Sequence, residues 1–321
     1  MTIKISGTGI GLPKLQLSND ELAELAQLDT SDEWIVSRTG IHSRYVCVDE
    51  TLTDLATTAA RAALDDAGLA AADIGYLICA TIGGETRTPS LACAVAERLG
   101  VDCAALDLNA ACAGFIYALD MAACLIGAGR AGHVLIISAE KMSGLVDWHD
   151  RSTCVLFGDG AAACVVSPGH ALAWLNVLTQ PDSAVITLPA NTTGNSPFAP
   201  RPNEQGFVQM DGQKVFKYAV TLLEREVARA LAALDLTADE IDYYVIHQAN
   251  KRIIDFAISR LGLAPAKFPL NIERYGNISA VSIPLLLHEM KAAGQIHPGD
   301  KLFMCAFGAG MTCGSCVLDW E

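Results

Sequence analysis

Two kinds of apolar pattern alternate along the chain. Short runs that are apolar almost throughout have strand length and end in glycine or polar clusters, whereas longer Ala-rich stretches have helical spacing and end at glycine. The first half predicts strands over 3–10, 74–81, 134–138 and 161–166, with helices beginning near 18 and spanning 53–68 and 90–99. Buried strands that alternate with helices are typical of βαβ units, so we expect an α/β fold with a mostly parallel sheet covered on both faces.

The second half repeats this order of elements. The apolar runs 241–246, 301–306 and 314–318 correspond to 74–79, 134–139 and 161–166, and 269–279 corresponds to 106–114. Identity between these segments is low, but their common order and spacing indicate an internal duplication. We therefore divide the chain into two halves, 1–170 and 171–321, and in this alignment Asn277 falls opposite Cys112.

Cys112 lies where a strand-like segment runs into small residues and then into a buried Ala-rich helix. A thiol at such a turn is close to unpaired backbone N–H groups and to the positive end of the helix dipole, and both favour the thiolate. The small neighbours leave room for a substrate. This pattern predicts a nucleophile; the alternative is that Cys112 is one more small core residue in a chain with eleven cysteines.

His247 directly follows the predicted strand 241–246, and Asn277 lies in the segment that corresponds to the Cys112 turn. Ligands of parallel α/β sheets bind beyond the carboxyl ends of the strands, so Cys112, His247 and Asn277 are predicted to meet at one edge. A single histidine is more often structural than catalytic. Three separate strand ends that carry Cys, His and Asn favour a catalytic site.

Composition predicts a globular, cytoplasmic protein. Of the 321 residues, 51% are hydrophobic, yet no apolar run is long enough to cross a bilayer, and the first residues predict a strand rather than a signal peptide. The net charge of −14 opposes general binding to nucleic acid or to an anionic membrane. The odd number of cysteines predicts free thiols. Cys313 and Cys316 have metal-site spacing, but no second pair accompanies them, so we expect no metal.

Five strings in this chain resemble motifs of the thiolase superfamily, and closely those of the β-ketoacyl-[acyl-carrier-protein] synthase III family. They are Thr30–Ile35 with Arg38–Ile41, Ala110–Phe115, Asp150–Arg151 with Phe157–Gly160, His247–Asn250, and Gly276–Asn277. The resemblance covers the whole chain. It implies two similar five-stranded halves in α-β-α-β-α layers, a two-fold homodimer, and a catalytic set of Cys112, His247 and Asn277.

The resemblance also implies a decarboxylative condensation that starts fatty-acid synthesis. Cys112 would take the acyl group of an acyl-CoA substrate as a thioester, and the enolate formed when malonyl-acyl carrier protein loses CO₂ would attack it, without a resident cofactor. The backbone N–H groups of Cys112 and Ala309 would form the oxyanion site, although related enzymes tend to have glycine at the latter position. Neutral His247 and the amide of Asn277 would donate hydrogen bonds to the malonyl thioester oxygen.

Binding residues follow from the same resemblance. For acyl-CoA it implies Trp34 and Arg151 around the adenine, Arg38 near the phosphates, and Gly212 and Asn250 along the phosphopantetheine arm; a surface ion pair with Asp150 is the alternative for Arg151. For the acyl pocket it implies Phe157 and Thr88. Many acetyl-specific relatives have Phe at the position of Thr88, and the smaller threonine leaves room for longer or branched acyl groups. For the acidic carrier protein, the candidate basic residues are Lys214, Lys217, Lys251, Arg252 and Arg260.

Other functions share some of these features. A degradative thiolase has the same fold but uses a second cysteine as base, and Asn277 argues against it. Two alternatives stay open: a relative from specialised metabolism that passes the acyl group from Cys112 to an alcohol or amine, and a catalytically silent partner subunit. Retention of Cys112, His247 and Asn277 together opposes the silent subunit.

Overall fold

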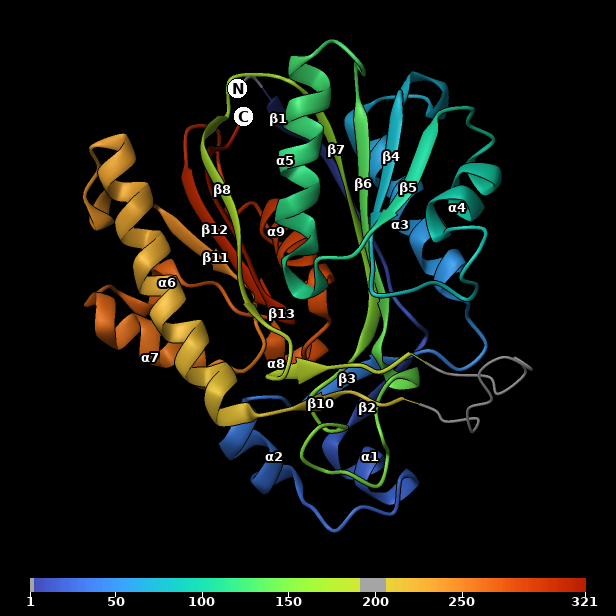
Figure 1. Ribbon diagram of the computed structural model, residues 1–321, viewed down its shortest axis with the longest axis vertical. Coiled ribbons are helices and arrows are strands. Elements are labelled where there is room, and N and C mark those ends of the chain that lie inside the picture. Colours follow the sequence, from blue (N-terminus) through green and yellow to red (C-terminus); the bar gives the residue numbers. More distant parts are fainter. Residues whose placement is uncertain (1–2, 191–205) are drawn as a thin grey trace.

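Two mixed β-sheets form the centre of the molecule (Figure 1). The computed structural model describes residues 3–190 and 206–321. The first sheet has the order β1 (Ile3–Gly11), β7 (Asp159–Pro168), β6 (Val134–Lys141), β4 (Tyr76–Ala80), β5 (Ala104–Leu108). The second has the order β11 (Tyr243–Ile246), β12 (Lys301–Gly308), β13 (Gly310–Asp319), β8 (Leu172–Asp182). Strands β4, β5 and β6 are mutually parallel, as are β11 and β12.

The helices begin and end at the signals that the sequence carries. In the described residues they are α1 (Asn19–Leu25), α2 (Asp32–Thr39), α3 (Leu52–Ala67), α4 (Leu91–Leu99), α5 (Gly114–Gly127), α6 (Gly212–Leu234), α7 (Lys251–Leu261), α8 (Ile272–Tyr275) and α9 (Ser282–Ala292). Ser18 caps α1 and Ser90 caps α4, while Gly68 ends α3 with a φ of 66°. Short strands pair as β2 (Leu15–Ser18) with β3 (Ser43–Val46) and β9 (Ile186–Thr187) with β10 (Gln209–Met210).

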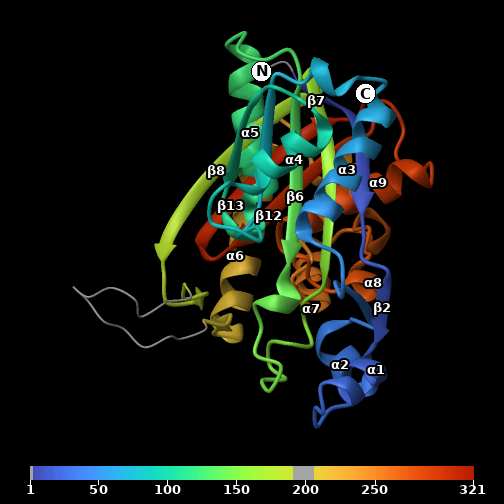
Figure 2. The same cartoon turned by 90° about the vertical axis from the view of Figure 1, so that its right-hand side faces the viewer.

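Alternating side chains on each strand pack against different helix layers. On β4, Ile78 packs in the core with α5 and α9, whereas Leu77 and Cys79 pack with α3 and α4. On the second sheet, Tyr244 packs with α6 and α7. Helices α5 and α9 therefore lie between the sheets, with α3 and α4 on one outer face and α6 and α7 on the other (Figures 1 and 2). This arrangement confirms the predicted α-β-α-β-α fold.

The second sheet has four strands among the described residues, not the five that the resemblance implied. The segment that was aligned with β5 contains Pro269, which has no N–H to donate to a strand ladder. Two and three residues further on, the N–H groups of Asn271 and Ile272 donate to the side-chain oxygen of Gln248, at 3.0 and 2.8 Å. A side chain thus replaces the strand partner, and the chain turns directly into α8.

The cysteines show the arrangement of core residues. All eleven are free thiols, and Cys313 and Cys316 both lie in β13, where they pack on opposite faces of the sheet. Residues separated by an odd number of positions in a strand point to opposite sides, so these two sulfurs cannot share a metal ion. Within the described ranges, no helix has both the length and the apolar composition required to cross a bilayer.

Candidate active site

Cys112 lies in a short 3₁₀ turn, Ala111–Ala113, that connects β5 to α5. The side-chain oxygen of Asn109 accepts a hydrogen bond from the N–H of Ala111 at 3.1 Å, and Ala111 adopts the left-handed φ of 49°. A residue with a Cβ is rarely found in this conformation. The turn is therefore held in a defined, strained shape, with Cys112 directly after the strained residue.

The same turn occurs in the second half. The side-chain oxygen of Asn277 accepts from the N–H of Ser279 at 2.9 Å, Ser279 also has a φ of 49°, and a 3₁₀ turn leads into α9. Asn277 therefore corresponds to Asn109, and the residue opposite Cys112 is Ala280. The predicted pairing of Asn277 with Cys112 is wrong by three positions, because weak identity does not fix an alignment within a turn.

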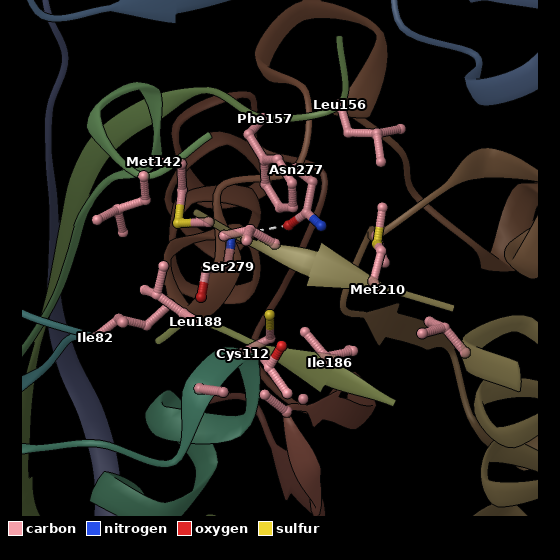
Figure 3. A pocket seen from close by; sticks show the side chains of 18 of the residues that line it. Ile82, Cys112, Met142, Leu156, Phe157, Ile186, Leu188, Met210, Asn277 and Ser279 are labelled. Carbon is pink, nitrogen blue, oxygen red and sulfur yellow. Dashed lines mark hydrogen bonds between the residues drawn. The ribbon is translucent and has the colours of Figure 1, made fainter. Parts of the chain in front are cut away.

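Asn277 is placed by backbone pairing with the segment before β7. Its N–H donates to the carbonyl of Leu156 at 2.8 Å, and its carbonyl accepts from the N–H of Gly158 at 3.2 Å. A Cβ on Gly158 would lie 2.3 Å from the carbonyl oxygen of Tyr275, so this close approach requires glycine. Since the side-chain oxygen of Asn277 already accepts from Ser279, its NH₂ group is the part left to donate to a ligand (Figure 3).

His247 follows β11 and is 1% exposed. Its Nδ1 lies 2.6 Å from the hydroxyl of Ser282, which itself donates to the carbonyl of Ser279 at 2.7 Å. A hydroxyl has one proton, so this network assigns the imidazole proton to Nδ1 and leaves Nε2 as an acceptor. Burial lowers the pKa of His247 to about 3, so the ring is neutral near pH 7. Neutrality is as predicted, but donation from Nε2 requires the other tautomer.

The surroundings of Cys112 favour the protonated thiol. Burial raises the pKa of Cys112 to about 12, a hydrogen bond with the Ser279 side chain lowers it, and the nearby Glu140 carboxyl raises it further. Burial of this partly exposed residue opposes the effect of the turn, which favours the thiolate.

One cavity of about 1280 Å³ contains the predicted catalytic groups. Cys112, His247, Asn277 and Ala309 all line it, as do Arg38, Phe157, Gly212, Asn250 and Arg252. Figure 3 shows Ser279 between Cys112 and Asn277, with Phe157 beside Asn277. A Cβ on Gly308 would lie 2.6 Å from the nitrogen of Cys112, so glycine lets the strand after α9 approach the nucleophile closely. Ala309 has no left-handed φ, and its Cβ is therefore accommodated without strain.

The predicted CoA residues form a second cluster near the cavity. Arg38 and Arg151 place their guanidinium carbons 4.7 and 4.9 Å from the ring centre of Trp34. Arg151 also donates to the carbonyl of Asp29 and lies 3.9 Å from its carboxylate, so its ion-pair partner is Asp29 and not Asp150. Of these three residues, only Arg38 lines the cavity. Both guanidinium groups therefore lie against the indole ring of Trp34.

Of the other residues predicted to bind the substrate, some line the cavity and one does not. Gly212 starts α6, and Asn250 caps α7 by accepting from the N–H of Arg252 at 2.9 Å. Phe157 lies in the cavity wall, whereas Thr88 is exposed and does not line the cavity in this chain. The apolar part of the wall has further members that the sequence analysis did not identify: Ile82, Met142, Leu145, Leu188 and Val208.

Two polar residues of the site were also missed, Ser279 and Glu140. The sequence carries no signal for the role of Ser279 apart from its position two residues after Asn277. Glu140 has a clearer sequence signal, because it is an acidic residue at the end of the apolar run of β6, and acidic residues are rarely buried without a specific partner.

The predicted basic patch is largely neutralised within the chain. Lys214, Lys251 and Arg260 pair with Asp211, Asp255 and Glu224, at 3.5, 2.7 and 2.6 Å. In the described part of the chain, Lys217 and Arg252 form no ion pair, and Arg252 lines the cavity. Arg252 is therefore the member of the set that is both uncompensated and next to the cavity.

Comparisons with known proteins agree with this geometry. The family model described as 3-oxoacyl-[acyl-carrier-protein (ACP)] synthase III matches residues 106–182, and that of its C-terminal part matches 231–320. A β-ketoacyl-[acyl-carrier-protein] synthase III of Clostridium perfringens is 42% identical over 324 residues, 98% of each chain. The crystal structure of 3-oxoacyl-[acyl-carrier-protein] synthase III from Aquifex aeolicus is 39% identical, with a TM-score of 0.92 over 99% of this chain and 100% of that one. The priming β-ketosynthase of a polyketide biosynthetic pathway is 32% identical, with a TM-score of 0.89 over 100% of this chain and 96% of that one. The chain thus belongs to the β-ketoacyl-[acyl-carrier-protein] synthase III family.

Proposed function

We propose that this protein condenses an acyl-CoA primer with malonyl-acyl carrier protein to give 3-oxoacyl-acyl carrier protein, the initiating step of fatty-acid synthesis. The observation that carries the proposal is the convergence of Cys112, His247 and Asn277 in one cavity from three separate strand ends. Full-length similarity to β-ketoacyl-[acyl-carrier-protein] synthases III supports it. CoA enters as part of the substrate and not as a resident cofactor.

In the first half-reaction, the sulfur of Cys112 forms a bond with the acyl carbonyl carbon, and the bond from that carbon to the CoA sulfur breaks. Negative charge develops on the carbonyl oxygen. We assign the N–H groups of Cys112 and Ala309 to stabilising that charge, and the close approach of Gly308 to the nitrogen of Cys112 supports this assignment.

In the second half-reaction, malonyl loses CO₂ and charge grows on its thioester oxygen. The NH₂ group of Asn277 donates one hydrogen bond to that oxygen. His247 supplies a second in the tautomer that carries its proton on Nε2, in which the Ser282 hydroxyl turns from the carbonyl of Ser279 to donate to Nδ1. The low pKa of His247 keeps the ring neutral in either tautomer.

The acyl primer is expected to be longer than acetyl. Apolar side chains form the wall next to Cys112, with Ile82, Met142 and Leu188 close by in Figure 3. Intact-protein mass spectrometry after incubation with an equimolar mixture of acyl-CoAs measures both the nucleophile and the preferred chain. We expect the mass of a medium or branched acyl group on Cys112. Acetyl as the sole adduct would refute the length preference, and no adduct with any acyl-CoA would refute the proposed function.

The malonyl carrier is proposed to dock at the cavity mouth near Arg252. Acyl carrier proteins are acidic, and Arg252 is an uncompensated cation there. Arg252→Glu should raise KM for the carrier about tenfold at low salt, with a smaller effect at high salt because added ions screen the interaction. Arg130→Glu, in the turn between α5 and β6 at the opposite sheet edge, is the matched charge reversal. Equal effects of both variants would point to overall charge instead of local docking.

We further propose that Trp34 and Arg151 open to hold the adenine of CoA between them, displacing the arginine contacts with the ring. The edge strand β5 supports the proposal of a homodimer, because its outer backbone groups have no strand partner among the described residues and its side chains are only partly covered. The free thiols of the protein support the proposal of a cytoplasmic location.

The second candidate function is priming of a polyketide pathway, favoured by the similarity to the priming β-ketosynthase.

A further inference from the structure

A buried carboxyl group lies close to the nucleophile and has no part in the reaction as described above. Glu140, at the end of β6, is 1% exposed. Its Oε1 accepts a hydrogen bond from the hydroxyl of Ser279 at 3.1 Å, and its Oε2 accepts from the N–H of Ile82 at 3.2 Å. Burying a carboxyl group costs free energy, and in the described part of the chain only these two hydrogen bonds from neutral donors compensate for it. We therefore ask what function a carboxyl group at this position could have.

The hydroxyl of Ser279 connects this carboxyl to the thiol. It donates to Glu140, and it lies beside the side chain of Cys112 in the cavity wall, where it lowers the pKa of that thiol. The backbone of Ser279 is fixed at both ends, because its N–H donates to Asn277 and its carbonyl accepts from Ser282. Figure 3 shows the side chains of Cys112 and Ser279 next to each other in the cavity. The hydroxyl of Ser279 therefore lies between the thiol of Cys112 and the carboxyl of Glu140.

We propose that Ser279 and Glu140 form a proton relay that deprotonates Cys112 for its attack on the acyl donor. Ser279 lies beside the reacting sulfur, and Glu140 is a positioning residue that acts through it. The identity of the acyl donor rests on the proposed function, but deprotonation of the thiol does not.

Over the whole acyl transfer, the relay neither gains nor loses a proton. The thiol proton moves to the Ser279 oxygen as the proton of that hydroxyl moves to Oε1 of Glu140, which leaves a thiolate and a neutral carboxylic acid. The thiolate forms the new thioester, and CoA leaves as a thiolate. The acid then returns its proton through Ser279 to the CoA sulfur, so that free CoA thiol is released and the carboxylate is restored.

The electrostatic setting gives this relay a pH dependence. Burial raises the pKa of Glu140 to about 8; hydrogen bonds from Ile82 and Ser279 lower it, and the charge of Asp159 on β7 raises it. Cys112 is the other titratable group facing it, across Ser279. Below pH 8 the carboxyl is mostly protonated and cannot accept a proton; above pH 8 it can. His247, with a pKa of about 3, cannot produce a transition in this range.

The test is the rate of Cys112 alkylation by iodoacetamide, measured across pH values on both sides of 8. The wild-type rate should rise with an inflection near 8, as Glu140 loses its proton. Ser279→Ala and Glu140→Gln should each lose the inflection and react about 10²-fold more slowly above it, and the double variant should be no slower than either single one. Retention of the inflection in both single variants would overturn the proposal.

The variants are chosen so that a folding defect can be recognised. Ala111 occupies the equivalent position with the same φ of 49°, so alanine is compatible with the backbone of Ser279. Ser138→Ala is the control, because Ser138 is a fully buried hydroxyl on the same strand as Glu140 and has no hydrogen-bond partner among the described residues. It should keep the wild-type pH profile.

Two further measurements distinguish a proton relay from a purely structural role of Ser279. Decarboxylation of malonyl-acyl carrier protein should persist in Ser279→Ala, because the backbone that orients Asn277 is retained. Loss of decarboxylation together with alkylation would indicate a structural role and overturn the relay. Normal alkylation profiles with no reaction of acyl-CoA would instead overturn the proposed function and leave the relay supported, since iodoacetamide requires no substrate recognition.

Discussion

Replacement of Cys112 by alanine is expected to abolish acyl transfer while decarboxylation of malonyl-acyl carrier protein continues. The sulfur is the atom that forms the acyl bond, and no other thiol lines the cavity among the described residues. The groups assigned to decarboxylation, His247 and Asn277, belong to the second half and keep their own partners. A radiolabelled acyl-CoA burst measures the first activity, and CO₂ release measures the second.

The control for this prediction is Cys124→Ala, which removes an exposed thiol on α5 and should leave both activities unchanged. Persistent acyl label on the Cys112→Ala protein would show that the nucleophile is a different residue. Loss of CO₂ release would show that the sulfur also takes part in the second half-reaction.

Asn277→Asp is expected to slow decarboxylation by about 10²–10³-fold, the usual cost of removing one donor from a site that stabilises developing negative charge. Aspartate can still accept from the N–H of Ser279, so the turn should remain. The atom that faces the ligand changes from a hydrogen-bond donor to a carboxylate oxygen, which repels the nascent enolate. Initial rates of CO₂ release at saturating malonyl carrier provide the measurement.

Asn109→Asp makes the same chemical change in the equivalent turn of the first half. Because Asn109 has no assigned part in decarboxylation, this variant should release CO₂ at close to the wild-type rate. If both variants lose activity equally, the loss comes from the turn. Undiminished CO₂ release by Asn277→Asp would exclude the amide as the donor.

Local sequence features determined most of the secondary structure. Apolar runs gave the strands, Ser18 and Ser90 marked helix starts, and Gly68 marked a helix end. These signals depend on backbone geometry and on neighbours within a few positions, so they can be read without a tertiary structure. The prediction failed near Pro269, where a distant side chain, Gln248, supplies the partner that a strand would have had.

The sequence by itself determined the alternation of strands and helices, the duplication, and the delivery of Cys112 and His247 to strand ends. Only the tertiary structure decided that Asn277 matches Asn109, that burial opposes a thiolate at Cys112, and that Glu140 is hydrogen-bonded to Ser279. The reason is physical: spacing along the chain fixes periodicity and direction, whereas pKa values, tautomers and relays depend on burial and on contacts between the two halves. Ser279 and Glu140 are 139 positions apart, and folding alone brings them within 3.1 Å.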